Sequence, residues 1–220
     1  MSCSRCPRLR AHCEQIARVK RRAFRDQEYW GRPVPGFGDR RARVLFCGLA
    51  PAAHGANRTG RMFTGDDSGN WLYAALHRAG FATQETSSGD GDGLALRGAF
   101  ITASARCAPP GNRPSPAELA ACAPFLDREI ELLDRVRVVV ALGQIAWNAM
   151  LQRALRVDPA SVAIPRPKFG HGAEARVRIR VGETIALLAS YHPSRQNTNT
   201  GRLTRPMLDA VLLRARDLAG

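Results

Sequence analysis

Residues 136–142 read Val-Arg-Val-Val-Val-Ala-Leu, a largely β-branched run that is interrupted by one polar residue, Arg137. A strand without alternating polar residues is typical of a parallel sheet that is covered on both faces. Comparable apolar segments occur at 43–49, 99–105 and 184–189, and the stretches between them are long enough for helices. This alternation predicts an α/β fold, a three-layer sandwich around a short, mainly parallel four-stranded sheet.

The expected helices carry recognisable end signals. Ser68 is predicted to cap a helix that runs to Arg78, and Ser115 a helix that runs to about Leu133, the latter with Pro and Glu at favoured positions of the first turn. Further helices are expected over 8–25, after Gly143 and over 203–218.

The composition indicates one globular domain with an anionic partner. The 220 residues include 45% hydrophobic residues, enough for a core, so 1–220 is predicted to be a single domain in which 1–42 form an N-terminal arm. Lys+Arg 33 against Asp+Glu 19 gives a net charge of +14, which excludes an acidic disordered chain. Arginine forks match phosphate oxygens, so the charge favours a nucleic-acid partner, although a GC-rich genome also favours arginine.

No run of the sequence approaches the roughly 18 apolar residues of a membrane helix, and the N-terminus lacks the apolar core of a signal peptide. We therefore expect a soluble, cytoplasmic protein with no membrane partner.

Six cysteines divide into two groups. Cys13 and Cys47 are expected to be packing residues, the latter inside an apolar strand. The others could supply four thiolates to one metal site, and spacing alone leaves zinc and an iron–sulfur cluster as alternatives. These four are Cys3, Cys6, Cys107 and Cys122.

Two long loops follow predicted strands. Residues 48–66 contain many small residues, which let a ligand approach the backbone. Phe63 in the same stretch does not belong to a periodic apolar pattern, so its ring could offer a face to a planar base. Asp66 ends this loop and is either a functional carboxylate or a helix cap. Residues 191–202 place His192 between a strand end and a proline, ahead of hydroxyl and amide side chains that suit phosphate contact. Loops at the carboxyl ends of parallel strands share one edge of the sheet, so these two and 106–115 are expected to form one site.

Taken together, Gly-Leu-Ala-Pro-Ala at 48–52, Thr-Gly-Arg-Met-Phe-Thr-Gly-Asp at 59–66, and His-Pro-Ser at 192–194 with Asn197 resemble the uracil-DNA glycosylase superfamily. The resemblance is greatest to its family 5 (type b) iron–sulfur branch, in an actinobacterial-like form, and it covers nearly the whole chain. It implies a DNA repair glycosylase that flips a damaged base out of DNA and hydrolyses its N-glycosidic bond, leaving an abasic site. It also implies a [4Fe-4S] cluster on the four cysteines named above, DNA in single- or double-stranded form as partner, and a monomer.

The resemblance implies roles for ten residues. The catalytic candidates are Asp66, with Asp67 as an undecided neighbour, His192 and Asn112. The substrate-binding candidates are Gly48, Ala50, Ala52, Phe63, Ser194, Arg195 and Asn197.

The chain departs from other branches of the superfamily in two places. Leu49 and Ala50 stand where those branches carry a polar residue that activates water, and Ala103 stands where they carry an Asn that reads uracil. Fewer groups are then left unpaired by a wrong base, so we expect a broad enzyme that releases uracil and other deaminated bases such as hypoxanthine.

Two other functions are consistent with parts of the sequence. A non-catalytic nucleic-acid-binding module with a structural four-cysteine zinc site accounts for the charge and the cysteines. A different α/β hydrolase acting on nucleotides is the third, although the chain has neither a G-x-S-x-G elbow nor a Walker loop.

Overall fold

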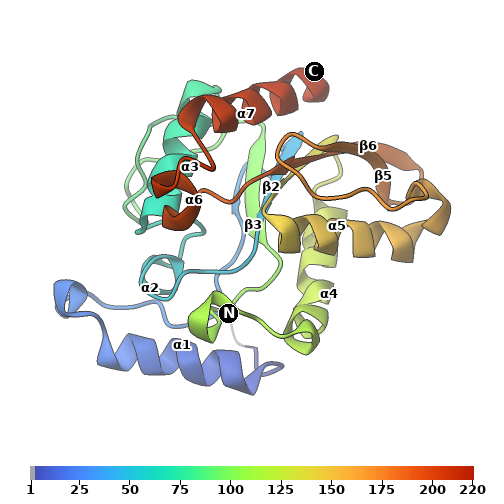
Figure 1. Cartoon of the computed structure of the whole chain (residues 1–220). Coiled ribbons are helices and arrows are strands. Elements are labelled where there is room, and N and C mark those ends of the chain that lie inside the picture. The colour runs from blue at the N-terminus through green and yellow to red at the C-terminus, as the bar shows by residue number, and fades with distance from the viewer. Residues whose placement is uncertain (1–2) are drawn as a thin grey trace.

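The computed structural model describes residues 3–220, which are built around one six-stranded sheet (Figure 1). The strand order is β1-β3-β2-β4-β6-β5, in which the four inner strands are parallel and the two outer strands are antiparallel to their neighbours. The strands are β1 (Phe37–Gly38), β2 (Val44–Gly48), β3 (Ala99–Ala103), β4 (Val138–Leu142), β5 (Glu174–Arg180) and β6 (Glu183–Ser190).

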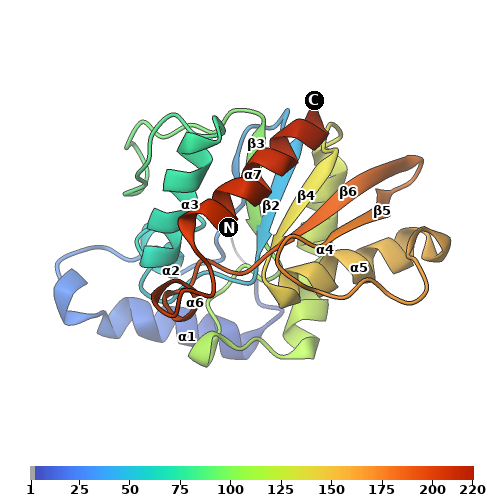
Figure 2. The ribbon, with the colours of Figure 1, turned by 45° about the horizontal axis from the view of Figure 1, so that its top comes forward.

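Helices cover both faces of this sheet, as Figure 2 shows. Helices α3 and α7 pack through residues such as Leu72 and Leu212 on the face that carries Phe46. Helices α4 and α5 pack through Ile130 and Trp147 on the opposite face. The three-layer α/β sandwich predicted from the sequence is confirmed. The helices are α1 (Pro7–Val19), α2 (Ala56–Thr59), α3 (Asp67–Arg78), α4 (Pro116–Leu132), α5 (Gln144–Val157), α6 (Arg195–Asn199) and α7 (Arg205–Ala219), with 3-10 turns at Arg22–Phe24, Pro110–Asn112 and Pro159–Ser161.

The prediction of four strands was incomplete, because the sheet has two further antiparallel strands at its edges. Strand β5 alternates apolar and arginine residues, and Val177 and Ile179 are fully buried while Arg176 and Arg178 are exposed. Such alternation is typical of a strand with one solvated face and differs from the continuous apolar runs that predict the inner strands. Strand β1 is too short to leave any pattern.

One of the predicted helix ends is confirmed by the structure, and two others differ from it. Ser115 accepts a hydrogen bond from the Glu118 backbone N–H at 3.2 Å, and Glu118 accepts one from the Ser115 N–H at 2.7 Å, which confirms the expected capping box. Helix α3, in contrast, is capped by Asp66, which accepts from the Gly69 N–H at 2.9 Å, so the expectation of a Ser68 cap was wrong. Helix α1 also ends at Val19, earlier than expected.

Within residues 3–220, none of the helices has both the length and the apolar character needed to cross a bilayer.

The N-terminal arm packs against the edge of the sheet where β2 ends. Trp30 and Gly31 donate backbone hydrogen bonds of 2.9 and 3.0 Å to carbonyl oxygens of α2, and the Asn57 side chain of α2 donates to the carbonyl of Cys13 in α1 at 3.3 Å. Both views show α1 alongside α2 (Figures 1 and 2). The arm therefore lies against the loops that follow the parallel strands.

Candidate active site

The loops that follow β2, β3 and β6 enclose a hollow of about 470 Å³ at the carboxyl edge of the sheet. Strand pairing brings these loops together, since Gly48 at the end of β2 lies beside Ala103 at the end of β3. The lining residues are Leu49, Ala50, Ala52, Met62, Phe63, Asp66, Ser68, Asn112, His192, Ser194, Arg195 and Gln196.

An aromatic pair forms one wall of the hollow. The rings of Phe63 and His192 are stacked, with centroids 5.7 Å apart and planes inclined by 29°. Phe63 has a positive φ of 54° and its ring lies against the backbone of Gly48, where a Cβ atom would be 2.8 Å from two ring carbons. The strand-end glycine therefore leaves the space that the phenyl ring occupies.

A buried polar network fixes the loop that carries Phe63. The Tyr73 hydroxyl of α3 donates to the Met62 carbonyl at 2.9 Å, and Thr64 shares a 2.7 Å hydrogen bond with Ser87. Arg61 pairs with Asp92 at 2.8 Å, both side chains being less than a tenth exposed. Although burial alone would raise it, Arg61 and nearby backbone N–H groups hold the pKa of Asp92 at about 2. The wall of the hollow is thus fixed by an ion pair that survives well below neutral pH.

His192 is a neutral imidazole in this setting. Burial lowers its pKa to about 4, well below the usual 6.5. Its backbone is held on both sides: the Asn197 amide donates to the His192 carbonyl at 2.8 Å, and the Tyr191 N–H donates to Nδ1 of His171 at 3.2 Å. A fixed neutral imidazole can donate a hydrogen bond without carrying a charge.

The two neighbouring aspartates have different surroundings. Asp66 lines the hollow, and burial raises the pKa of its carboxyl, while the Gly69 N–H occupies Oδ1. Its Oδ2 points toward Gly55, where a Cβ atom would come within 2.6 Å of it. Asp67 instead forms an ion pair with the exposed side chain of Arg195. Only the first of the two carboxylates lines the hollow.

Most of the residues singled out from the sequence meet here. Eight line the hollow: Ala50, Ala52, Phe63, Asp66, Asn112, His192, Ser194 and Arg195. Gly48 lies beneath Phe63, and the Asn197 side chain is turned toward the His192 carbonyl, so neither is part of the lining. Four lining residues were not among the site candidates, namely Leu49, Met62, Ser68 and Gln196, and only their position within the same loops could have indicated them.

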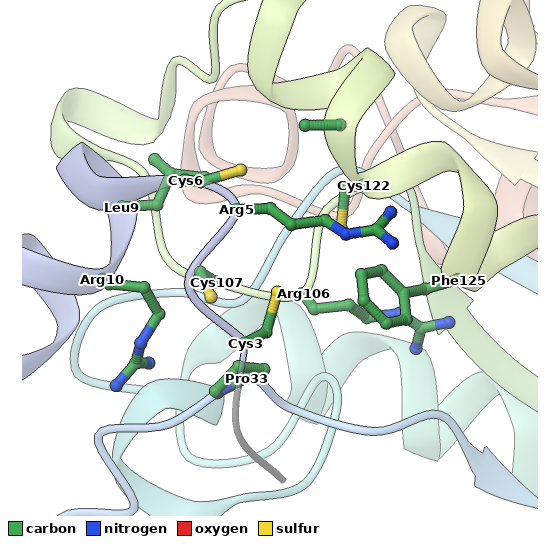
Figure 3. A pocket seen from close by; sticks show the side chains of 11 residues that line it. Cys3, Arg5, Cys6, Leu9, Arg10, Pro33, Arg106, Cys107, Cys122 and Phe125 are labelled. Atoms are coloured by element: carbon green, nitrogen blue, oxygen red, sulfur yellow. The ribbon is translucent and has the colours of Figure 1, made fainter.

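A second, smaller cavity of about 60 Å³ lies between the N-terminal arm and α4 (Figure 3). Cys3 and Cys6 from the arm, Cys107 from the loop after β3 and Cys122 from α4 all line it. No three His, Cys, Asp or Glu side chains within 3–220 are grouped closely enough to hold a metal ion. The four thiols thus surround a shared cavity without meeting at one point. Four thiols are the donor set of an iron–sulfur cluster or of structural zinc.

The two remaining cysteines are fully buried, as expected for packing residues. Cys13 lies in a small apolar cluster with Leu9 and Cys107 and donates weakly to the Ala108 carbonyl at 3.7 Å. Burial raises the pKa of Cys47, in the middle of the sheet, to about 12, so this thiol stays protonated.

Comparison with known proteins places this arrangement in a family. A sequence profile described as "Uracil DNA glycosylase superfamily" matches residues 35–216. The chain belongs to the uracil-DNA glycosylase superfamily. The resemblance seen in the two loop motifs is thereby confirmed.

Relatives of this superfamily also cover the N-terminal arm. A type-5 uracil-DNA glycosylase from Mycobacterium tuberculosis is 56% identical over 219 residues, 99% of this chain and 78% of the relative. One from Thermus thermophilus is 53% identical over 220 residues, all of this chain and 94% of the relative. A type-4 enzyme from Archaeoglobus fulgidus is 30% identical over 162 residues, 73% of this chain and 70% of the relative. The type-5 alignments span the segment with Cys3 and Cys6, which the profile match does not reach.

Proposed function

We propose that the 470 Å³ hollow receives a uracil flipped out of DNA and that the chain hydrolyses the N-glycosidic bond of that nucleotide, leaving an abasic site. The chain is a DNA repair glycosylase by family, and its type-5 relatives are similar over its whole length. The observation that carries the assignment to this site is that Phe63, Asp66 and His192, from two loops far apart in sequence, line one hollow. A non-catalytic binding module does not account for this arrangement.

Each wall of the hollow suits one part of the substrate. Phe63 offers an aromatic face on which the base can stack. His192 donates a hydrogen bond to a base carbonyl as negative charge builds on the departing base, a contribution that is typically a few kcal/mol. Asp66 stabilises the cationic sugar or orients the attacking water, and Asn112 lies where it can contact the base or that water.

Contacts to the DNA backbone are assigned to the outer rim. Ser194 and the exposed Arg195 also line the hollow, and their side chains are suited to phosphate contact. The chain's net charge of +14 supports the long-range attraction to DNA. We expect the chain to act as a monomer in the cytoplasm, on single- or double-stranded DNA.

The function is tested with an end-labelled oligonucleotide that contains one uracil. Incubation with the purified chain followed by alkaline treatment is expected to cut the strand at the uracil and nowhere else. A thymine-containing oligonucleotide of the same sequence is the control. An intact uracil strand at equimolar or excess protein would contradict the assignment.

The specificity is proposed to extend beyond uracil. Ala103, which is almost fully buried at the end of β3, offers no side-chain hydrogen bond to a base. A site with fewer obligatory hydrogen bonds leaves fewer buried groups unpaired when the base changes. On duplexes with single lesions we expect uracil to be released fastest and hypoxanthine to be released measurably. Strict release of uracil alone would show that the hollow discriminates by other means.

The cofactor is proposed to be a [4Fe-4S] cluster bound by Cys3, Cys6, Cys107 and Cys122. A single zinc ion needs four sulfurs at about 2.3 Å from one point, whereas a cluster is bound by sulfurs that surround a larger volume. The thiols here line a cavity and come from three segments of the chain, which supports the cluster. When bound, such a group supplies a covalent tie between the arm, the loop that bears Asn112, and α4.

A further inference from the structure

Two arginines line the cysteine cavity, of which Arg106 is buried and Arg10 is largely buried. The Arg106 side chain is 5% exposed and that of Arg10 is 16% exposed. In each, the Nη1 atom is buried and has no hydrogen-bond partner, a property shared in residues 3–220 only by the Asn57 side-chain oxygen. Buried donors are nearly always paired in folded proteins, and an unpaired one on a charged group is especially costly.

The protein's own carboxylates reach only the other end of each guanidinium. Arg10 donates through Nη2 to Glu14, a largely exposed residue, at 2.8 Å. Arg106 pairs through Nη2 with Glu129, a carboxylate that also accepts hydrogen bonds from Thr102 at 2.6 Å and from the Gly36 N–H at 3.2 Å. The Nη1 ends therefore remain for whatever occupies the cavity.

Nothing in the cavity lining supplies the missing anion. Besides the four thiols and the arginines Arg5, Arg10 and Arg106, its lining consists of apolar side chains, and it includes no Asp or Glu. Figure 3 shows Arg10 beyond Cys107 and Arg106 on the opposite side of the group of sulfurs. A group held by four thiolates carries a net negative charge, because the ligand charges exceed that of a [4Fe-4S] core or a zinc ion.

We propose that Arg10 and Arg106 are the counter-charges of the cysteine-bound group, stabilising it and making it harder to oxidise. This inference rests on the proposed cluster. A fixed positive charge near a cluster favours the state with more electrons, so its removal makes loss of an electron easier. The role is electrostatic, and these arginines are positioning and charge-balancing residues for the cluster rather than catalytic ones.

The test uses Arg10→Gln and Arg10→Lys in the full chain purified without oxygen. The readouts are iron and sulfide per chain and the rate at which ferricyanide bleaches the absorption at about 400 nm. Arg10→Gln is expected to bleach at least about threefold faster than the parent protein, and Arg10→Lys, which keeps the charge, to restore most of the difference. Arg8→Gln is the matched control, because Arg8 is on the same helix and pairs with Glu118 but does not line the cavity.

A second variant covers the other side of the cavity. Arg106→Gln alone would leave the partly buried carboxylate of Glu129 without its ion-pair partner, so the double variant Arg106→Gln with Glu129→Gln is compared with Glu129→Gln alone. Faster bleaching in the double variant supports the proposal. Unchanged bleaching in both Gln variants, with the parent protein loaded with iron, would overturn it. A parent protein that holds zinc or no metal would instead contradict the proposed cofactor, while the uracil assay reports separately on the proposed function.

Discussion

Replacing His192 by alanine is expected to lower the single-turnover rate of uracil release about 10²- to 10³-fold while leaving the Kd for DNA nearly unchanged. The ring lines the hollow and stacks on Phe63, and the backbone around it is held by the hydrogen bonds at Tyr191 and Asn197, so it is prepositioned to donate to a leaving base. Such a donor acts on charge that develops only in the transition state, and its loss therefore affects rate more than binding.

The pH dependence of the same rate reports on the charge of His192. Its folded-state pKa of about 4 lies below the usual 6.5, so the neutral ring is the form present at neutral pH. In the Asp66→Asn variant, which removes the other titrating group that the hollow uses, the rate should be level from neutral pH down to about 5 and should fall as the pH drops through about 4. The same shift contributes stability above pH 6.5 that is lost as the pH falls from 6.5 through 4.

His77→Ala is the matched control, because His77 is a partly exposed helix residue 3.5 Å from Glu85 and outside the hollow. A rate that rises as the pH falls toward 4 would indicate an imidazolium as the active form. A His192→Ala protein with the full rate would show that the active site does not include His192.

The inner strands of the fold could be predicted because both faces of the sheet are covered. Val138 to Leu142 are all buried, so every position of this strand is apolar. Such a continuous run can be recognised in the sequence without an alternating pattern. Strand β5 lies at the edge, where Arg176 and Arg178 face solvent, and its arginine-rich sequence looks like a basic loop when read without its neighbour. β5 forms a strand by pairing with β6, and this pairing is not visible in the sequence of residues 174–180 alone.

The site could be predicted in outline because parallel strands bring their loops to one edge. The direction of individual side chains was not predictable to the same degree. Asn197 was assigned to phosphate or sugar, but residues 195–199 form the short helix α6, capped by Ser194, and this turn directs the Asn197 amide to the His192 carbonyl. Gln196, one residue earlier, lines the hollow instead. A one-residue difference in a five-residue helix decides which amide faces the substrate.

Asp66 was predicted to be either a functional carboxylate or a helix cap, and the structure is compatible with both roles. The carboxylate caps α3 through the Gly69 N–H and also lines the hollow. Asp66→Asn separates the two roles, because asparagine is as good an N-cap as aspartate but carries no charge. We expect this variant to keep the free energy of unfolding within about 0.5 kcal/mol and to lower the single-turnover rate roughly 10- to 100-fold.

Asp66→Ala removes the cap as well, and it should show a similar loss of rate together with a loss of about 1 kcal/mol in stability. Asp67→Asn is the neighbouring comparison. It breaks the ion pair with Arg195 at the rim without changing the lining, so its effect on the rate should be several-fold smaller than that of Asp66→Asn. If the order is reversed, Asp67 is the functional carboxylate and Asp66 is a helix cap alone. Chemical denaturation and single-turnover cleavage of the three variants distinguish these outcomes, because a cap acts on the folded state and a catalytic charge acts on the barrier.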